Sequence, residues 1–176
     1  MNTPLIFTVI GGDRPGLVGE LARVVSAHQG NWLESSMAQL AGQFAGIVKV
    51  AVPPSNAAAL QAELAQLEAR SGLKVMVVAG TENSALARRR LKLSLVGHDR
   101  IGIVREVSQV LARFAVNVES LETRTASAPM SADMLFHAEA ELTAAPELDA
   151  RALTDELERL SADLMVDIAL DESIRR

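Results

Sequence analysis

One short phrase occurs twice in the chain. Residues 11–18 read GGDRPGLV and residues 97–104 read GHDRIGIV, and each copy stands between an apolar run and a segment with helical periodicity. Nine identical pairs share this spacing without a gap: Leu5 and Leu91, Gly11 and Gly97, Asp13 and Asp99, Arg14 and Arg100, Gly16 and Gly102, Val18 and Val104, Glu20 and Glu106, Val24 and Val110, and Asn31 and Asn117. The repeat predicts an internal duplication, so both halves are expected to share one fold.

The residues after each phrase place their apolar positions on one face of a helix. The first face comprises Leu17, Val18, Leu21, Val24, Val25 and His28, and the second comprises Ile103, Val104, Val107, Val110, Leu111 and Phe114. Two unrelated amphipathic helices would share such a face. They would not also share Asp-Arg-x-Gly before it and Asn after it, which favours duplication.

The same pattern of elements is expected in both halves. Expected strands are 4–10, 32–40, 44–52 and 73–78 in the first half, and 91–96, 118–125, 133–142 and 164–170 in the second. Expected helices are 16–28 and 102–114, with a second helix in each half marked by Leu60, Leu64 and Leu67 or by Leu153, Leu157 and Leu160. Asn56 is a candidate N-cap and Gly72 a candidate terminator of the second helix. Each half then reads β-α-β-β-α-β.

This order predicts an α+β protein with two tandem ferredoxin-like domains, in which two helices cover each antiparallel sheet. The first domain is expected at residues 1–80, a linker at 81–90 and the second domain at 91–172.

Composition narrows the classes of function. The chain has no cysteine, which excludes disulfides and cysteine-ligated metals. Its formal net charge of −5, four Phe and one Trp argue against direct binding of nucleic acid. No apolar run reaches the roughly 18 residues that a membrane span requires, and no basic leader precedes the first strand, so a cytoplasmic location without membrane attachment is expected.

The repeated phrase combines features that suit a small zwitterion. A helix start offers unpaired N–H groups and the positive end of the helix dipole to a carboxylate. Gly16 and Gly102 leave the main chain open to a ligand, and Pro15 presets φ at the first helical turn. Asp13 and Asp99 would repel a simple anion but pair with an ammonium group. The alternative is that each Asp only caps its helix.

Asn31 and Asn117 follow the helices and open the next strands. Their amides offer a donor and an acceptor to a bound amino acid, and we expect them near the neighbouring strand end. The alternative for Asn31 is a tight turn after Gly30.

Catalytic motifs are missing from the sequence. His28, His98 and His137 belong to no metal-ligand spacing, and there is no nucleophile elbow or P-loop. Glu139 and Glu141 have the spacing of a carboxylate pair, but an exposed sheet stripe explains them better. We therefore expect no enzyme, no cofactor and no metal.

The two halves resemble ACT domains, the amino-acid-sensing modules of βαββαβ topology, and GGDRPGLV followed by a helix and Gly30-Asn31 carries the resemblance. A chain that consists of two such modules and little else resembles the glycine-cleavage-system transcriptional repressor family. The resemblance implies an effector such as glycine or serine, a homo-oligomer, and a DNA-binding protein partner such as a transcription activator. Carried over by motif, the implied ligand-binding residues are Asp13, Arg14, Pro15, Gly16, Leu17, Asn31, Asp99, Arg100, Gly102, Ile103 and Asn117.

The second copy departs from the first at two positions. Ile101 replaces Pro15 and loses the preset φ, and His98 replaces Gly12 and adds a bulky ring that is a further candidate ligand contact. We therefore expect the two loops to differ as sites. The leading hypothesis is a non-catalytic amino-acid-sensing transcriptional regulator, and the alternative is a ligand-free interaction or assembly module that regulates a metabolic enzyme.

Overall fold

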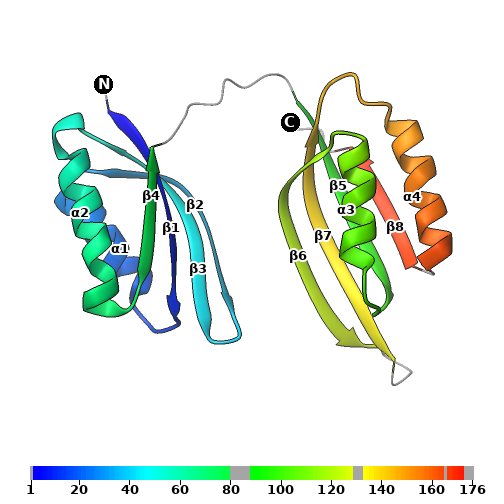
Figure 1. Ribbon diagram of the computed structural model, residues 1–176, viewed down its shortest axis with the longest axis horizontal. Helices are drawn as coiled ribbons and strands as arrows, with labels where there is room; N and C mark the ends of the chain where they lie inside the picture. The colour runs from blue at the N-terminus through cyan, green and yellow to red at the C-terminus, as the bar shows by residue number, and fades with distance from the viewer. Residues whose placement is uncertain (1, 80–87, 129–132, 165, 173–176) are drawn as a thin grey trace. The chain divides into compact units, whose positions relative to one another are not determined.

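The computed structural model describes residues 2–79, 88–128, 133–164 and 166–172 of the 176-residue chain. The chain divides into two compact units, Met1–Ser84 and Ala85–Arg176 (Figure 1). Each unit has its own sheet, its own pair of helices and its own hydrophobic core. None of the helices in the described ranges combines the length and hydrophobicity needed to span a membrane.

The first unit has one four-stranded antiparallel sheet in the order β2-β3-β1-β4. Its elements in chain order are β1 (Thr3–Gly12), α1 (Leu17–Ala27), β2 (Asn31–Leu40), β3 (Gln43–Val52), α2 (Pro54–Ser71) and β4 (Lys74–Ala79).

The second unit repeats this topology with the sheet order β6-β7-β5-β8. Its elements are β5 (Arg89–His98), α3 (Ile103–Arg113), β6 (Asn117–Ser127), β7 (Met134–Ala144), α4 (Ala150–Leu164) and β8 (Val166–Glu172). The predicted α+β class and the duplicated ferredoxin-like topology are therefore confirmed. Both first strands are longer than expected and run into the repeated phrase, through Gly12 and His98.

Both helices of a unit cover the same face of its sheet (Figure 1). Strand residues that alternate toward this face, such as Phe7 and Val48, are fully buried against helix residues such as Leu21, Leu60 and Leu64. In the second unit, every second residue along most of β5 and β7 is buried in the same way. The apolar residues of the strands and of the helices therefore pack together in one layer per unit, as the sequence pattern predicts.

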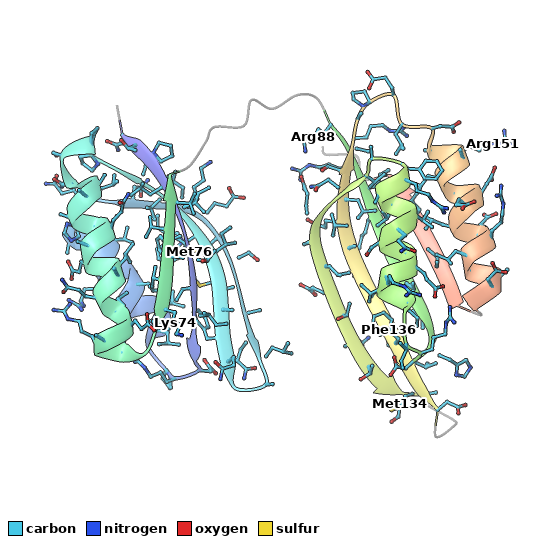
Figure 2. All side chains as sticks on the ribbon, in the orientation of Figure 1. Lys74, Met76, Arg88, Met134, Phe136 and Arg151 are labelled. Atoms are coloured by element: carbon cyan, nitrogen blue, oxygen red, sulfur yellow. The ribbon has the colours of Figure 1, made fainter. Side chains whose placement is uncertain are left out.

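The open faces of the two sheets differ. In the first unit, Ile10, Ile47, Met76 and Val78 lie on the open face and are 48–64% exposed; Met76 is labelled in Figure 2. In the second unit, charged side chains occupy the open face, and Lys92 Nζ lies 2.8 Å from a Glu139 carboxylate oxygen. The two units thus share one backbone fold, but the open sheet face is apolar in the first unit and charged in the second.

The expected N-cap of α2 is wrong. The helix begins at Pro54 and its N-cap is Pro53, because proline suits the first helical turn, where its missing N–H has no partner to lose. The Asn56 side chain instead donates a hydrogen bond to the His28 carbonyl at 3.0 Å, which ties the start of α2 to the end of α1. The predicted terminator is confirmed, because Gly72 ends α2 with a left-handed φ of 75°.

The expected linker, residues 81–90, lies mostly outside the described residues. Its last two residues, Arg89 and Arg90, belong to β5 and pair with Ala144 and Thr143 of β7.

Truncation of Leu64 tests the core of the first unit. Leu64 is fully buried, so Leu64→Ala is expected to lower the free energy of unfolding of this unit by about 2–5 kcal/mol, from lost apolar burial and a residual cavity. Leu40→Ala is the control, because Leu40 is 79% exposed and should change stability by less than about 0.5 kcal/mol. Urea denaturation followed by circular dichroism measures both, and equal effects would contradict the described core.

Candidate functional site

The repeated phrase forms the same strand–turn–helix junction in both units. Gly16 and Gly102 are the N-caps of α1 and α3, with φ of 94° and 101°. A side chain is strained at such positive φ, so the backbone conformation requires glycine here. A Cβ on Gly16 would meet no atom within 4 Å. The conformation, rather than room for a ligand, therefore explains glycine at this position.

Neither helix start is capped by a side chain. Asp13 and Asp99 therefore do not cap α1 and α3, and the alternative reading of these residues is wrong. The N-cap carbonyl of α1, Gly16 O, accepts a hydrogen bond from the Glu20 N–H at 2.9 Å. The N-cap carbonyl of α3, Gly102 O, accepts one from the Glu106 N–H at 3.0 Å. The preceding N–H groups have no intrahelical acceptor, so each junction presents donors at the positive end of a helix.

Asp13 and Asp99 are both exposed, while their main chains are fixed by hydrogen bonds. The Asp13 N–H donates to Gly42 O in the β2–β3 turn, and the Asp99 N–H donates to Met134 O at the start of β7, each at 2.9 Å. The hairpin of each unit thus holds its phrase in place. In each phrase the Asp stands three residues before the glycine at which the helix begins, so a carboxylate and uncapped helical N–H groups belong to one short segment, which can accept both ends of a zwitterion.

The arginines of the two phrases are already paired. Arg14 Nη2 lies 2.6 Å from a Glu20 carboxylate oxygen, and Arg100 Nη2 lies 3.0 Å from a Glu106 carboxylate oxygen. The hydrogen bond from Arg14 lowers the pKa of Glu20, against a smaller desolvation effect that raises it. These carboxylates were missed as members of the site, although Glu20 and Glu106 match at the spacing of the repeat.

The remaining predicted loop residues fall into two groups. Leu17 and Ile103 are 2% exposed and belong to the cores, so their side chains do not face a ligand at the junctions. Pro15, His98 and Ile101 are exposed, and Ile101 is fully so. The second junction therefore carries Ile101 in place of Pro15, and the imidazole of His98 where the first junction has Gly12.

The structure does not bring the asparagines to these junctions within one unit. Asn31 pairs with Ala51, which also pairs with Pro4 near the start of β1, whereas Gly12 at the end of β1 pairs with Gln43. Eight residues of extended strand separate the two levels, about 26 Å at roughly 3.3 Å per residue. Asn117 is placed in the same way opposite Thr143. The expected proximity fails because β1 and β2 run in the same direction.

Other titratable groups form structural pairs. His28 Nε2 lies 2.7 Å from a Glu63 carboxylate oxygen and so joins α1 to α2. The hydrogen bond from Lys92 lowers the pKa of Glu139, which is an exposed ion-paired residue of the sheet. Across the described ranges, no group of three or more His, Cys, Asp or Glu side chains could hold a metal ion.

The ACT domain family model matches residues 3–78. The match spans nearly all of the described part of the first unit. The second unit repeats its topology, so the chain has a tandem ACT fold. The same fold extends over the full length of two solved structures.

An unknown protein from Galdieria sulphuraria is 28% identical, with a TM-score of 0.88 over 99% of this chain and all of that one. A candidate glycine cleavage system transcriptional repressor is 21% identical, with a TM-score of 0.74 over 99% of each chain. A search of curated proteins finds no match.

The ion pair at the first junction can be tested directly. Arg14→Met should raise the pKa of Glu20 toward its ordinary value of 4.5, because the main cause of its lowering is removed. A lowered folded-state pKa means that the pair stabilises the fold above the ordinary pKa and loses this effect as the pH falls. Carbon-13 NMR titration of the Glu20 carboxyl measures the shift, and Arg100→Met in the second unit is the control that should leave Glu20 unchanged. An unchanged Glu20 pKa in Arg14→Met would contradict the pairing.

Proposed function

We propose that this ACT domain protein is a non-catalytic regulator that senses a small amino acid at its repeated phrase. The observation that carries the proposal is the pair of glycine-started helices that no side chain caps, each with an exposed Asp at its entrance. Helical N–H groups bind the ligand carboxylate, and Asp13 or Asp99 binds its ammonium group.

The paired arginines favour a small ligand. Because Glu20 neutralises Arg14, and Glu106 neutralises Arg100, the carboxylate is bound mainly by main-chain donors close to the glycine. These donors lie at the first helical turn, where a compact amino acid reaches them together with the Asp. Glycine and serine are the first candidates, and the likeness of the fold to a candidate glycine cleavage system transcriptional repressor supports this choice.

Asn31 contributes to such a site only across an interface with another unit, and we place that unit in a second copy of the chain. Within the first unit it lies about 26 Å along the sheet from the phrase, too far for one small ligand to contact both. The proposal therefore includes a homo-oligomer in which Asn31 of one copy approaches the phrase of another. Ligand binding then favours one arrangement of the copies and changes affinity for a partner.

The proposed regulation of transcription acts through a DNA-binding protein. A net charge of −5 gives the chain no excess of cations to neutralise phosphates. A protein partner such as a transcription activator therefore supplies the contact with DNA.

Calorimetry of the full chain tests the sensing proposal. Glycine and serine are expected to bind, and Asp13→Asn should weaken binding by about tenfold or more, because it removes the charged partner of the ligand ammonium group. Asp155→Asn, which changes an exposed carboxylate on α4, is the matched control and should leave binding unchanged. No binding of either amino acid to the native protein would overturn the proposal.

The apolar open face of the first sheet favours a second candidate function, an assembly module that works without a ligand. Ile10, Ile47, Met76 and Val78 form a half-exposed surface across β1, β3 and β4. Apolar surface of this kind marks contact sites on soluble proteins, and its burial between copies would drive assembly.

Ile47→Lys tests the assembly candidate. If copies associate through this face, a lysine at its centre should shift the protein to smaller species in analytical ultracentrifugation, because a charge would be buried without a partner. Val96→Lys is the control, because Val96 occupies the open face of the second sheet among charged residues. An unchanged sedimentation profile for Ile47→Lys would contradict assembly through the first sheet.

A further inference from the structure

The strand β6 forms one edge of the second sheet. It spans 11 residues, whereas β8 at the other edge spans 7. Within the described ranges, β6 pairs with β7 alone, and its outer side meets no other strand (Figure 1). The pairing is irregular between Val118 and Ser120, but it is regular from Ser120 to Ser127, where the sequence has no proline. A regular edge of this length offers its outward N–H and C=O groups to another extended segment.

An apolar groove lies beside this edge, between α3 and the helix-covered face of the sheet. Val118 and Leu121 of β6 stand opposite the buried Leu142 and Ala140 of β7, so they face the helix side. They are nevertheless 39% and 47% exposed, and Val104 of α3 is 43% exposed. Core residues of β5, α3 and β7 complete the lining, among them Phe136, which is labelled in Figure 2.

The size of the groove suits one aliphatic side chain. Its volume is about 30 Å³, close to that of one water molecule in the liquid. The end of a valine side chain that enters from the edge of the sheet would occupy this space and bury the exposed parts of Val118, Leu121 and Val104.

The corresponding space in the first unit is filled by the chain itself. Trp32 of β2 stands at the position of Val118, and Met37 stands at the position of Thr123. Both side chains pack against the first core, and the Trp32 ring meets Phe7 edge-on, with 6.3 Å between the ring centroids. The smaller residues of β6 leave this space open in the second unit. The two edges therefore differ in their capacity to accept a side chain from outside.

The open face of the second sheet bears an excess of negative charge next to β6. Glu122 of β6 stands directly opposite Glu139 of β7. Glu139 pairs with Lys92 at 2.8 Å, and Arg90 pairs with Glu119 at 4.0 Å. Among the described residues on or beside this face, acidic side chains outnumber basic ones: Glu119, Glu122, Glu139, Glu141 and Asp171 against Arg90, Lys92 and Arg124. Basic side chains on this side of an added strand would be attracted to it.

We propose that β6 is the docking edge for an extended segment of a protein partner in which aliphatic and basic residues alternate. The main chain of the segment pairs with β6 as an added strand. Successive side chains of a strand point to opposite faces, so the aliphatic residues face the groove beside Leu121 while the basic residues lie against Glu122. This docking goes beyond the proposed sensing function and does not depend on a ligand at the repeated phrase.

Two synthetic peptides test the proposal on the full chain labelled with nitrogen-15. The peptide KVKVKVK, blocked at both ends, is expected to bind, to shift the amide signals of β6 more than those of β2, and to slow hydrogen exchange of the outward amides of β6. The peptide EVEVEVE has the same alternation and the opposite charge. It is expected to bind about tenfold more weakly or worse, because its carboxylates would face Glu122 and its neighbours.

Val118→Trp tests the groove, because it places in the second unit the residue that fills this space in the first. It should weaken binding of KVKVKVK by about tenfold or more and leave stability to urea nearly unchanged, because Val118 is not a core residue. Val18→Trp is the matched control, since Val18 is an exposed valine on α1 of the first unit, and it should leave peptide binding unaltered.

Glu122→Lys tests the charge separately from the groove. It should weaken binding of KVKVKVK and strengthen binding of EVEVEVE. The proposal would be overturned if KVKVKVK does not bind, if both peptides bind the native chain equally well, or if neither Val118→Trp nor Glu122→Lys changes the binding. A native chain that sediments as a larger species and becomes smaller in Val118→Trp would assign the edge to a second copy, which also overturns it.

Failure of this proposal and failure of amino-acid sensing have different signatures. Glycine binding that depends on Asp13, without binding of KVKVKVK, removes only the docking edge. Peptide binding that depends on Val118 and Glu122, without glycine or serine binding, removes only the sensing function of the phrase.

Discussion

The fold and the candidate site both depend on how the chain turns from its first strand into its first helix. A glycine with positive φ makes this turn at Gly16 and again at Gly102, and the helix begins without a side-chain cap. The conformation that places Leu17 and Ile103 in the cores also leaves N–H groups at the helix start without intrahelical acceptors. The need for glycine at the turn and the capacity of the helix start to bind a carboxylate thus arise from the same backbone geometry.

Much of the fold follows from periodicity alone. Alternating apolar residues in the strands and a 3.6-residue period in the helices specify which faces are buried, and Gly72 ends α2 because it adopts a left-handed conformation. The prediction of Asn56 as the N-cap of α2 was wrong because Pro53 and Pro54 determine where this helix begins. The sequence also did not predict that β1 extends through Gly12, because this extension depends on pairing with Gln43, a residue distant in the sequence.

Less of the site could be read from the sequence. Spacing identified the phrase but could not show that Arg14 is paired with Glu20, because charge pairing depends on side-chain geometry across a helical turn. Strand direction caused the larger error. Two strands that run in the same direction have their starts at one end of the sheet, so Asn31 opens β2 far from where β1 ends.

Duplication explains why the two units differ where they do. Core positions are constrained by packing in both copies, so Leu60 and Leu64 have counterparts in Leu153 and Leu157, all buried. The open sheet faces contact no helix, and substitutions there cost little stability in an isolated unit. One face has become apolar and the other charged. Divergence on surfaces that packing does not constrain is expected when two copies of one fold acquire separate binding tasks, and the open faces of the two sheets are where those tasks would lie.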